Sequence, residues 1–249
     1  MTFSIVARDE RTGAFGACGY TDISSYGAIV PHVSLHGAAA TQAYANVDNG
    51  IEVMQLLHTG QSAREAGEAV LAGDGRREMR QLLVTGEGDQ NFAWTGDQCI
   101  PWHGHRLERD HAVGANSIKS AAVINAISES FSASAEVEFT LRLIQAIQAG
   151  EHAGGHVDNV EVTDDTTGAI ATRSTSEVFG GVMSAAVMVA APEPEMWHNL
   201  RVDAHPSAID ELVETYNKAR HSAKLVATFY KGSIRIKPYY WRMVGESEK

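Results

Sequence analysis

The sequence predicts an α+β fold of four layers, a four-layer αββα sandwich in which two mostly antiparallel sheets lie between outer layers of helices. Short strand patterns follow one another through tight turns, which favours antiparallel pairing of neighbouring strands. Two pairs of amphipathic helices separate these groups of strands, and each pair needs a sheet face to cover. No Gly-x-Gly-x-x-Gly follows the first strand, so a doubly wound nucleotide-binding fold fits poorly.

The first half of the chain alternates hairpins and helices. Residues 1–9 and 14–20 are predicted to form a hairpin, and 27–31 and 37–43 are two further strands. A helix begins near Asp48 and ends at Gly60. Ser62 caps the next helix, which ends near Gly73, and Glu65 completes a capping box with it. Further strands are predicted over 80–84, 91–95 and 111–116.

The second half begins with two long helices, over about 120–131 and 135–149. Residues 157–177 are rich in Asp, Thr and Ser, which is typical of an exposed insertion such as a hairpin. Strands at 182–191 and 200–202 and a helix from Pro206 to about His221 follow. The segments 224–230 and 233–237 are predicted to close the fold as a hairpin. We expect one domain over residues 1–249, since no long linker interrupts it.

Composition narrows the classes of function. The 249 residues are 44% hydrophobic and carry a net charge of -11, which argues against nucleic acid or an anionic membrane surface as a partner. No apolar run approaches the roughly 20 residues that span a bilayer. The first residues resemble a buried strand and not a leader peptide. With two cysteines, Cys18 and Cys99, expected as buried thiols, the predicted compartment is the cytoplasm.

The first strand carries the main chemical hypothesis. If Met1 is removed, Thr2 has a free amine and a hydroxyl on the same residue at the start of a core strand. An N-terminal nucleophile (Ntn) hydrolase uses this pair, because the amine can serve as the base for the hydroxyl. An α-amine titrates near 8, so it is a competent base close to neutral pH. A β-branched residue in a strand is equally the ordinary structural reading.

Several strings resemble one prokaryotic family. They lie at 2–9, 27–31, 40–46, 99–105, 151–155 and 200–206, and Thr-Gln-Ala-Tyr-Ala-Asn at 41–46 is the most specific. On these strings the chain is similar to domain of unknown function 1028, which is grouped with the Ntn-hydrolase superfamily. The resemblance implies the αββα sandwich and a homo-oligomer, a dimer or higher, but no known substrate.

The chain departs from the family pattern at four places. Thr21-Asp22 stands where members usually carry Ser followed by Lys or His, and His156 stands where a Gly-Gly-Asp motif has its Asp. Phe-Gly-Gly-Val-Met at 179–183 replaces an Arg-Gly-x-Gln motif. The tail at about 222–249 is atypical of the family.

Candidate site residues follow from the resemblance and from the position of the strands. Thr2 is the nucleophile, and Asp22 is expected to orient or charge its amine. Amide side chains can donate to an oxyanion, which is the role expected of Asn46 or Asn116. The substrate-binding candidates are Thr21, Ser24, Gln42 and Tyr44. For each of these polar residues a turn or a satisfied backbone group is the structural alternative.

The leading hypothesis is a hydrolase of a small-molecule amide that needs no metal and no organic cofactor. His103 and His105 alternate along the chain but lack a third ligand at a recognisable spacing. Cys99 lacks a paired histidine, so it is not expected to be a nucleophile. One alternative is a non-catalytic binding or assembly protein of the same fold. Another is a hydrolase that uses the internal hydroxyl of Thr21 or Ser24 and keeps Met1.

Overall fold

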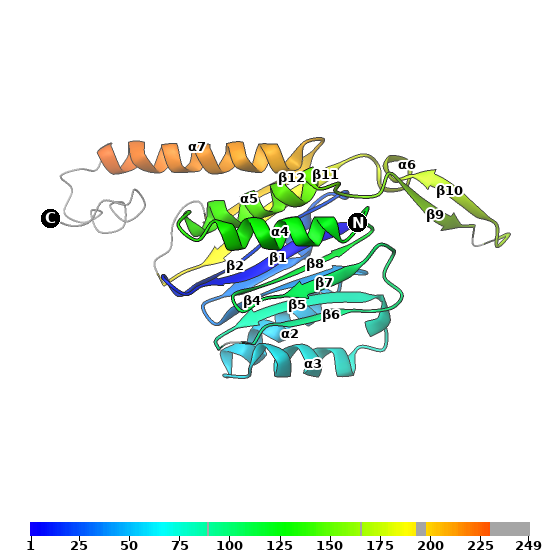
Figure 1. The fold of residues 1–249 in the computed structure, drawn as a ribbon, viewed down its shortest axis with the longest axis horizontal. Helices are drawn as coiled ribbons and strands as arrows, with labels where there is room; N and C mark the ends of the chain where they lie inside the picture. The colour runs from blue at the N-terminus through cyan, green and yellow to red at the C-terminus, as the bar shows by residue number, and fades with distance from the viewer. Residues whose placement is uncertain (89, 165, 193–197, 230–249) are drawn as a thin grey trace.

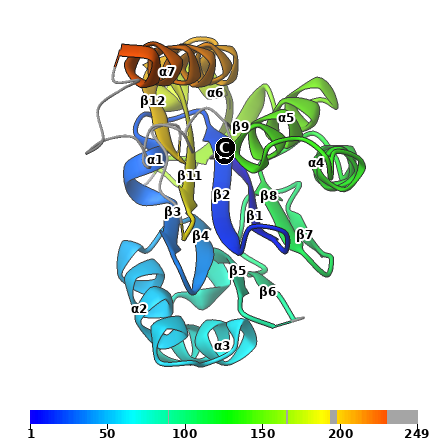
Figure 2. The ribbon, with the colours of Figure 1, turned by 90° about the vertical axis from the view of Figure 1, so that its left-hand side faces the viewer.

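The computed structural model describes residues 1–88, 90–164, 166–192 and 198–229. These residues form an α+β sandwich of four layers, as the sequence predicts. Figures 1 and 2 show two sheets packed face to face, with α2 and α3 outside one sheet and α4, α5 and α7 outside the other.

The larger sheet has six strands in the order β12-β11-β2-β1-β8-β7, and every neighbouring pair is antiparallel. Its centre is the predicted opening hairpin, whose strands are buried along almost their whole length. The strands are β1 (Thr2–Asp9), β2 (Ala14–Thr21), β7 (Gly104–Leu107), β8 (His111–Asn116), β11 (Met183–Ala190) and β12 (Asn199–His205).

The smaller sheet is an antiparallel meander, β3-β4-β5-β6. It consists of β3 (Pro31–Ser34), β4 (Gly37–Ala43), β5 (Arg80–Gly86) and β6 (Phe92–Thr95). Val6, Ala40 and Leu83 belong to the apolar cluster between the two sheets and are fully buried. At about 25 cal/mol for each Å² of apolar area removed from water, the buried side chains of Val6 and Leu83 contribute about 1.5–3 kcal/mol each.

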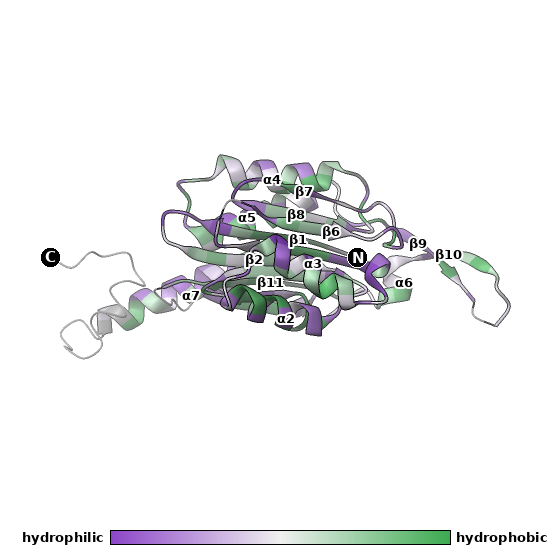
Figure 3. Ribbon diagram, turned by 90° about the horizontal axis from the view of Figure 1, so that it is seen from below, coloured by the Kyte–Doolittle hydropathy of each residue, from purple (hydrophilic) through white to green (hydrophobic). Residues whose placement is uncertain are grey.

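The helices are amphipathic and cover the outer faces of the sheets. On the smaller sheet lie α2 (Val47–His58) and α3 (Ala63–Gly73), the latter with the predicted capping box of Ser62 and Glu65. On the larger sheet lie α4 (Ala122–Ala133), α5 (Phe139–His152) and α7 (Ala208–Phe229). Hydrophobic and hydrophilic segments alternate along these helices, as Figure 3 shows for α3 and α4.

The predicted insertion is a hairpin that projects from one end of the sandwich (Figure 1). It consists of β9 (Asn159–Thr163) and β10 (Ile170–Ser174), which form a separate two-stranded sheet, and the short α6 (Thr175–Phe179) follows it. The chain's N-terminus lies at this same end.

Two predictions of local structure are wrong. The segment 27–31 is not a strand: α1 (Tyr26–Ile29) forms there, because the Tyr26 N–H donates to Ser184 Oγ and the tyrosine ring is buried. The first arm of the predicted closing hairpin is helical through Phe229, as part of α7. The second arm, 233–237, lies outside the described residues. The strand β7 and the 3-10 turn Arg77–Met79 are additional elements.

The apolar pattern predicts eight buried core residues, and the structure buries all of them except at two helix positions; the eight are Ile5, Val30, Leu56, Leu83, Val113, Leu141, Val187 and Leu212. Ile5, Val113 and Leu212 are fully buried, whereas Leu56 and Leu141 are partly buried at the edges of their clusters. Cys18 and Cys99 are buried free thiols, as expected. Within the described ranges, every helix is too short or too polar to cross a lipid bilayer.

Candidate functional site

Thr2 lies where two neighbouring strands end beside it. β1 pairs with β2 on one side and β8 on the other, so Thr2 is directly opposite both Thr21 and Asn116. Directly opposed residues of antiparallel strands point to the same face, so the three side chains project together. That face looks toward the smaller sheet, because Ser4, two residues along β1, donates to the Gln42 side chain on β4. The sequence-predicted residues Thr2, Thr21, Gln42 and Asn116 therefore share one buried layer.

The hydroxyl groups of Thr2 and Thr21 form a directional pair. Their oxygens are 3.0 Å apart, and Thr21 Oγ1 donates its hydrogen to the carbonyl oxygen of Met1 at 2.6 Å. Since a hydroxyl has a single hydrogen, Thr2 donates to Thr21 and not the reverse. The backbone N–H of Asp22 also points to the Met1 carbonyl, with an N–O distance of 3.4 Å. The bond between Met1 and Thr2 thus has its carbonyl oxygen between two donors.

The predicted neighbour of the chain terminus, Asp22, pairs with Met1. The terminal ammonium lies 2.9 Å from Asp22 Oδ1, and the Met1 side chain is fully covered. Burial raises the pKa of Asp22, although the positive charge of the ammonium acts in the opposite direction. The ion pair is therefore formed at low exposure, where attraction between the two charges is stronger than at the surface.

A residue that sequence reasoning did not place in the site, His156, lies beside this ion pair. Its ring stacks on Tyr20 at 4.9 Å, with the planes 1° apart, and contacts the Phe3 ring at the same centroid distance. Burial, assisted by the charge of the Met1 ammonium, lowers the pKa of His156 well below its ordinary value. The ring is therefore neutral near pH 7. The sequence holds one signal for His156: it stands at the position where the family resemblance implies an aspartate.

Buried amides form a network behind Thr2. Gln42 Nε2 donates to Gln81 Oε1 at 2.6 Å and to the Gly114 carbonyl at 3.0 Å. Asn116 Nδ2 donates to the same Gln81 oxygen at 3.2 Å. Gln81 itself donates to the backbone carbonyls of Gly104 and Ala115. This network fixes the Asn116 side chain, and Gln81, which was not predicted, is its centre.

The remaining predicted site residues lie outside this group. Asn46 caps α2 by accepting from the Asp48 N–H, and its own amide donates to Asn49 Oδ1 at 2.8 Å. Tyr44 is 51% exposed, and the guanidinium of Arg80 stacks on its ring at 4.9 Å. Ser24 is exposed on the loop after β2. The structure therefore gives Asn46 and Tyr44 structural partners and brings neither to Thr2.

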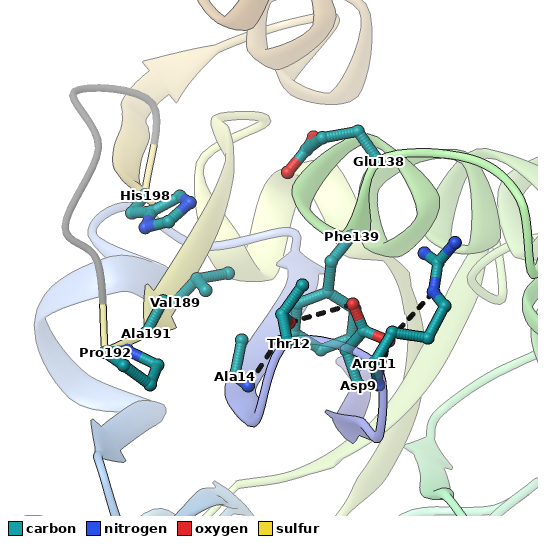
Figure 4. Close-up of a pocket in the computed structure, with 10 residues that line it drawn as sticks. All are labelled: Asp9, Arg11, Thr12, Ala14, Glu138, Phe139, Val189, Ala191, Pro192 and His198. Atoms are coloured by element: carbon teal, nitrogen blue, oxygen red, sulfur yellow. Dashed lines mark hydrogen bonds and ion pairs between the residues drawn. The ribbon is translucent and has the colours of Figure 1, made fainter. Parts of the chain in front are cut away.

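A cavity lies at the opposite end of β1. It has a volume of about 470 Å³ and is lined by Asp9, Arg11, Thr12, Ala14, Glu138, Phe139, Val189, Ala191, Pro192 and His198 (Figure 4). Seven residue steps of about 3.3 Å separate Asp9 from Thr2, which is roughly 23 Å. The carboxylates that line this cavity have structural partners: Asp9 accepts from Arg11 and Thr12, and Glu138 caps α5. The acidic groups of this cavity therefore have structural roles.

A second, more open groove of about 710 Å³ runs between α2 and β3 and includes His32, His36 and His58. His105, one of the two alternating histidines, contacts Thr95 Oγ1 through Nδ1 at 2.9 Å. In the part of the chain that the structure describes, no three His, Cys, Asp or Glu side chains are grouped to hold a metal ion.

Comparisons with known proteins agree with the fold. Residues 2–212 match the model of DUF1028, a family of unknown function. The crystal structure of protein SPO2555 from Silicibacter pomeroyi, described under the same family model, has a TM-score of 0.72 and 29% sequence identity. That similarity covers 88% of this chain and 85% of the other. Curated proteins gave no match. The chain therefore belongs to the DUF1028 family, whose function is unknown.

Proposed function

We propose that the protein is an amide hydrolase of the Ntn type, in which Thr2 acts as nucleophile and base once Met1 has been removed. The observation that carries this proposal is the buried pair of Thr2 and Thr21 hydroxyls, 3.0 Å apart at the start of a central strand. Removal of Met1 gives this same residue a free amine, which titrates near neutral pH without special tuning.

In the proposed reaction, Thr2 Oγ1 attacks the carbonyl carbon of the amide while the Thr2 amine takes the hydroxyl proton. The amine then gives the proton to the leaving nitrogen, the C–N bond breaks, and the acyl group stays on Thr2 as an ester. Water attacks the ester, releases a carboxylic acid and restores the hydroxyl. No metal or organic cofactor enters these steps.

Two donors are available for the negative charge that develops on the substrate oxygen. Thr21 Oγ1 and the Asp22 backbone N–H both point to the Met1 carbonyl oxygen, which supports their use for a substrate carbonyl. Asn116 is the third candidate, because Gln81 holds its amide opposite Thr2. Asn46 is less suitable, since its side chain caps α2.

The test uses protein whose first residue is Thr2, produced by cleaving a removable N-terminal fusion, and a panel of small amides. Thr2→Ala should lower turnover by about a thousandfold or more, because it removes the nucleophile, whereas Thr2→Ser should keep measurable turnover. Ser24→Ala is the matched control for the internal-nucleophile alternative and should be active. Full activity of Thr2→Ala with loss in Ser24→Ala would replace this proposal by that alternative.

The non-catalytic alternative also has a supporting observation. With Met1 in place, its carbonyl oxygen occupies the donors beside Thr2, and its ammonium occupies Asp22. A protein that keeps Met1 would therefore have no free amine at Thr2.

The two buried thiols are compatible with a reducing compartment such as the cytoplasm, which we propose as the place of action.

A further inference from the structure

Met1 is itself a chemical probe of the space next to Thr2. It is an α-aminoacyl group, joined through its carbonyl carbon to the Thr2 nitrogen. Each of its polar groups has a partner: the ammonium lies 2.9 Å from Asp22 Oδ1, and the carbonyl oxygen accepts from Thr21 Oγ1 at 2.6 Å. Its side chain is fully covered. The space is therefore complementary to an ammonium, a carbonyl and an apolar side chain held together.

The charge of the ammonium acts on two groups, Asp22 and His156. Among the described residues, the buried atoms without a hydrogen-bond partner include both carboxylate oxygens of Asp22 and Nε2 of His156. His156 stacks on Tyr20 and contacts Phe3 at a tilt, and these two residues oppose each other two positions further along the hairpin, on the same face as Met1 and Asp22. An ammonium has three hydrogens, and the ion pair with Asp22 Oδ1 at 2.9 Å can use only one of them. The remaining hydrogens of the ammonium therefore have Asp22 Oδ2 and His156 Nε2 as candidate acceptors.

The charge of the Asp22 carboxylate determines which acyl groups fit the position of Met1. A carboxylate there would face the Asp22 carboxylate at low exposure, and a neutral acyl group would leave that buried charge without its partner. An acyl group that carries an ammonium supplies the partner of the Asp22 carboxylate. The neutral imidazole of His156 adds an acceptor without a competing positive charge.

We propose that, once Met1 is removed, the position it occupies binds the α-aminoacyl part of the substrate, so that the substrate class is amides of α-amino acids with a free ammonium group. Asp22 binds the ammonium, Thr21 and the Asp22 N–H bind the carbonyl oxygen, and the covered space that the Met1 side chain occupies takes the side chain of the substrate. The reaction in this statement rests on the proposed function, whereas the binding specificity can be measured without turnover.

The test is calorimetric titration of full-length protein that begins at residue 2 and carries Thr2→Ala, which binds without hydrolysing. The probes are L-methioninamide and its desamino analogue, which differ only in the ammonium group. We expect methioninamide to bind at least about tenfold more tightly, as a charge-assisted hydrogen bond to a buried carboxylate implies. Asp22→Asn should remove this preference, and protein that keeps Met1 should bind neither probe.

Asp203→Asn is the matched control, because it removes a carboxylate that pairs with Arg201 in an exposed position. It should leave both affinities unchanged. Equal affinity for the two probes, no binding of either, or a preference that survives Asp22→Asn would each overturn the inference. Equal affinity is also the result expected if Asp22 turns to the Thr2 amine instead.

The two proposals fail separately. Selective binding of methioninamide without Thr2-dependent turnover of any amide overturns the hydrolase and leaves the binding site. Thr2-dependent turnover of neutral amides, with no preference for an ammonium, overturns the substrate class and leaves the hydrolase.

Discussion

The Thr21 hydroxyl stands between Thr2 and Met1: it accepts from Thr2 at 3.0 Å and donates to the Met1 carbonyl at 2.6 Å. One side chain therefore links the candidate nucleophile to the residue whose removal would activate it. Only the bond to the Met1 carbonyl is lost when Met1 is removed, so the contributions of the two hydrogen bonds can be separated by experiment.

Thr21→Val keeps the shape of the side chain and removes both hydrogen bonds. In protein that keeps Met1, we expect unfolding to become easier by about 1–2 kcal/mol, because the buried Thr2 hydroxyl loses its acceptor and the Met1 carbonyl one of its donors. In protein that begins at Thr2 the cost should be smaller, since the carbonyl partner is gone. Urea denaturation of both forms measures the difference, and Thr21→Ser should restore most of it. Equal costs in both forms would contradict the assigned direction of these bonds.

Gln81→Leu should be among the more destabilising polar substitutions in the chain. Gln81 is fully buried, and its loss leaves Gln42 and Asn116 without their shared acceptor and the Gly104 carbonyl without a donor. We expect a loss of about 3 kcal/mol in the free energy of unfolding. Gln55→Leu, on the exposed face of α2, is the control and should change stability by less than about 0.5 kcal/mol. Similar effects of both would show that the network contributes little.

The buried ion pair of Asp74 and Arg80 predicts a defined loss of stability in acid. Burial alone would raise the pKa of Asp74, but hydrogen bonds from Arg80, the Arg76 N–H and Asn49 lower it to about 2. Because the folded-state pKa is below the unfolded value of about 3.9, the stabilisation is complete above that value and is lost as pH falls toward 2. Asp74→Asn should cost about 2 kcal/mol at pH 7 and much less near pH 2, measured by denaturant titration at each pH. An equal cost at both pH values would contradict this prediction.

Asp22 should show the opposite pH dependence. Burial raises its pKa in the folded protein, so the folded state binds its proton more tightly than the unfolded state does. Stability relative to Asp22→Asn should therefore fall as pH rises from the ordinary aspartate value through the raised one. Parallel thermal denaturation of the two proteins between pH 4 and pH 8 measures this trend at about one-unit steps. A difference that grows with pH would mean that attraction to the Met1 ammonium outweighs the cost of burial.

The sequence predicts the layers of the fold well, because local signals specify them. Ser62 and Glu65 mark the start of α3 without any tertiary information, and the short run of small residues at 37–43 forms a buried strand as predicted. The helix at 26–29 could not be predicted in this way. It depends on Ser184, which is about 160 residues away and binds the Tyr26 N–H. Long-range contacts of this kind leave no local pattern.

The candidate site likewise contains residues that could be predicted from the sequence and residues that only long-range contacts reveal. Thr2 and Thr21 could be grouped in advance because strand ends bring them together, and the family resemblance added Asn116; in the structure β1 pairs with both β2 and β8. Gln81 and His156 were missed, since a buried amide in a strand and a histidine in a loop have no periodicity of their own. Only the pairing of β4 with β5, and the ring contacts of His156 with Phe3 and Tyr20, reveal their positions.

The central claim is that Thr2 acts through its own free amine, and it is tested most directly by comparing two forms of one protein. The same removable fusion is cut to leave either Thr2 or Met1 as the first residue, and both products are verified by intact mass. Turnover of a panel of α-amino acid amides and neutral amides is then measured under identical conditions. The account predicts turnover only by the form that begins at Thr2. Equal turnover by the form that keeps Met1 would contradict it and direct attention to an internal nucleophile.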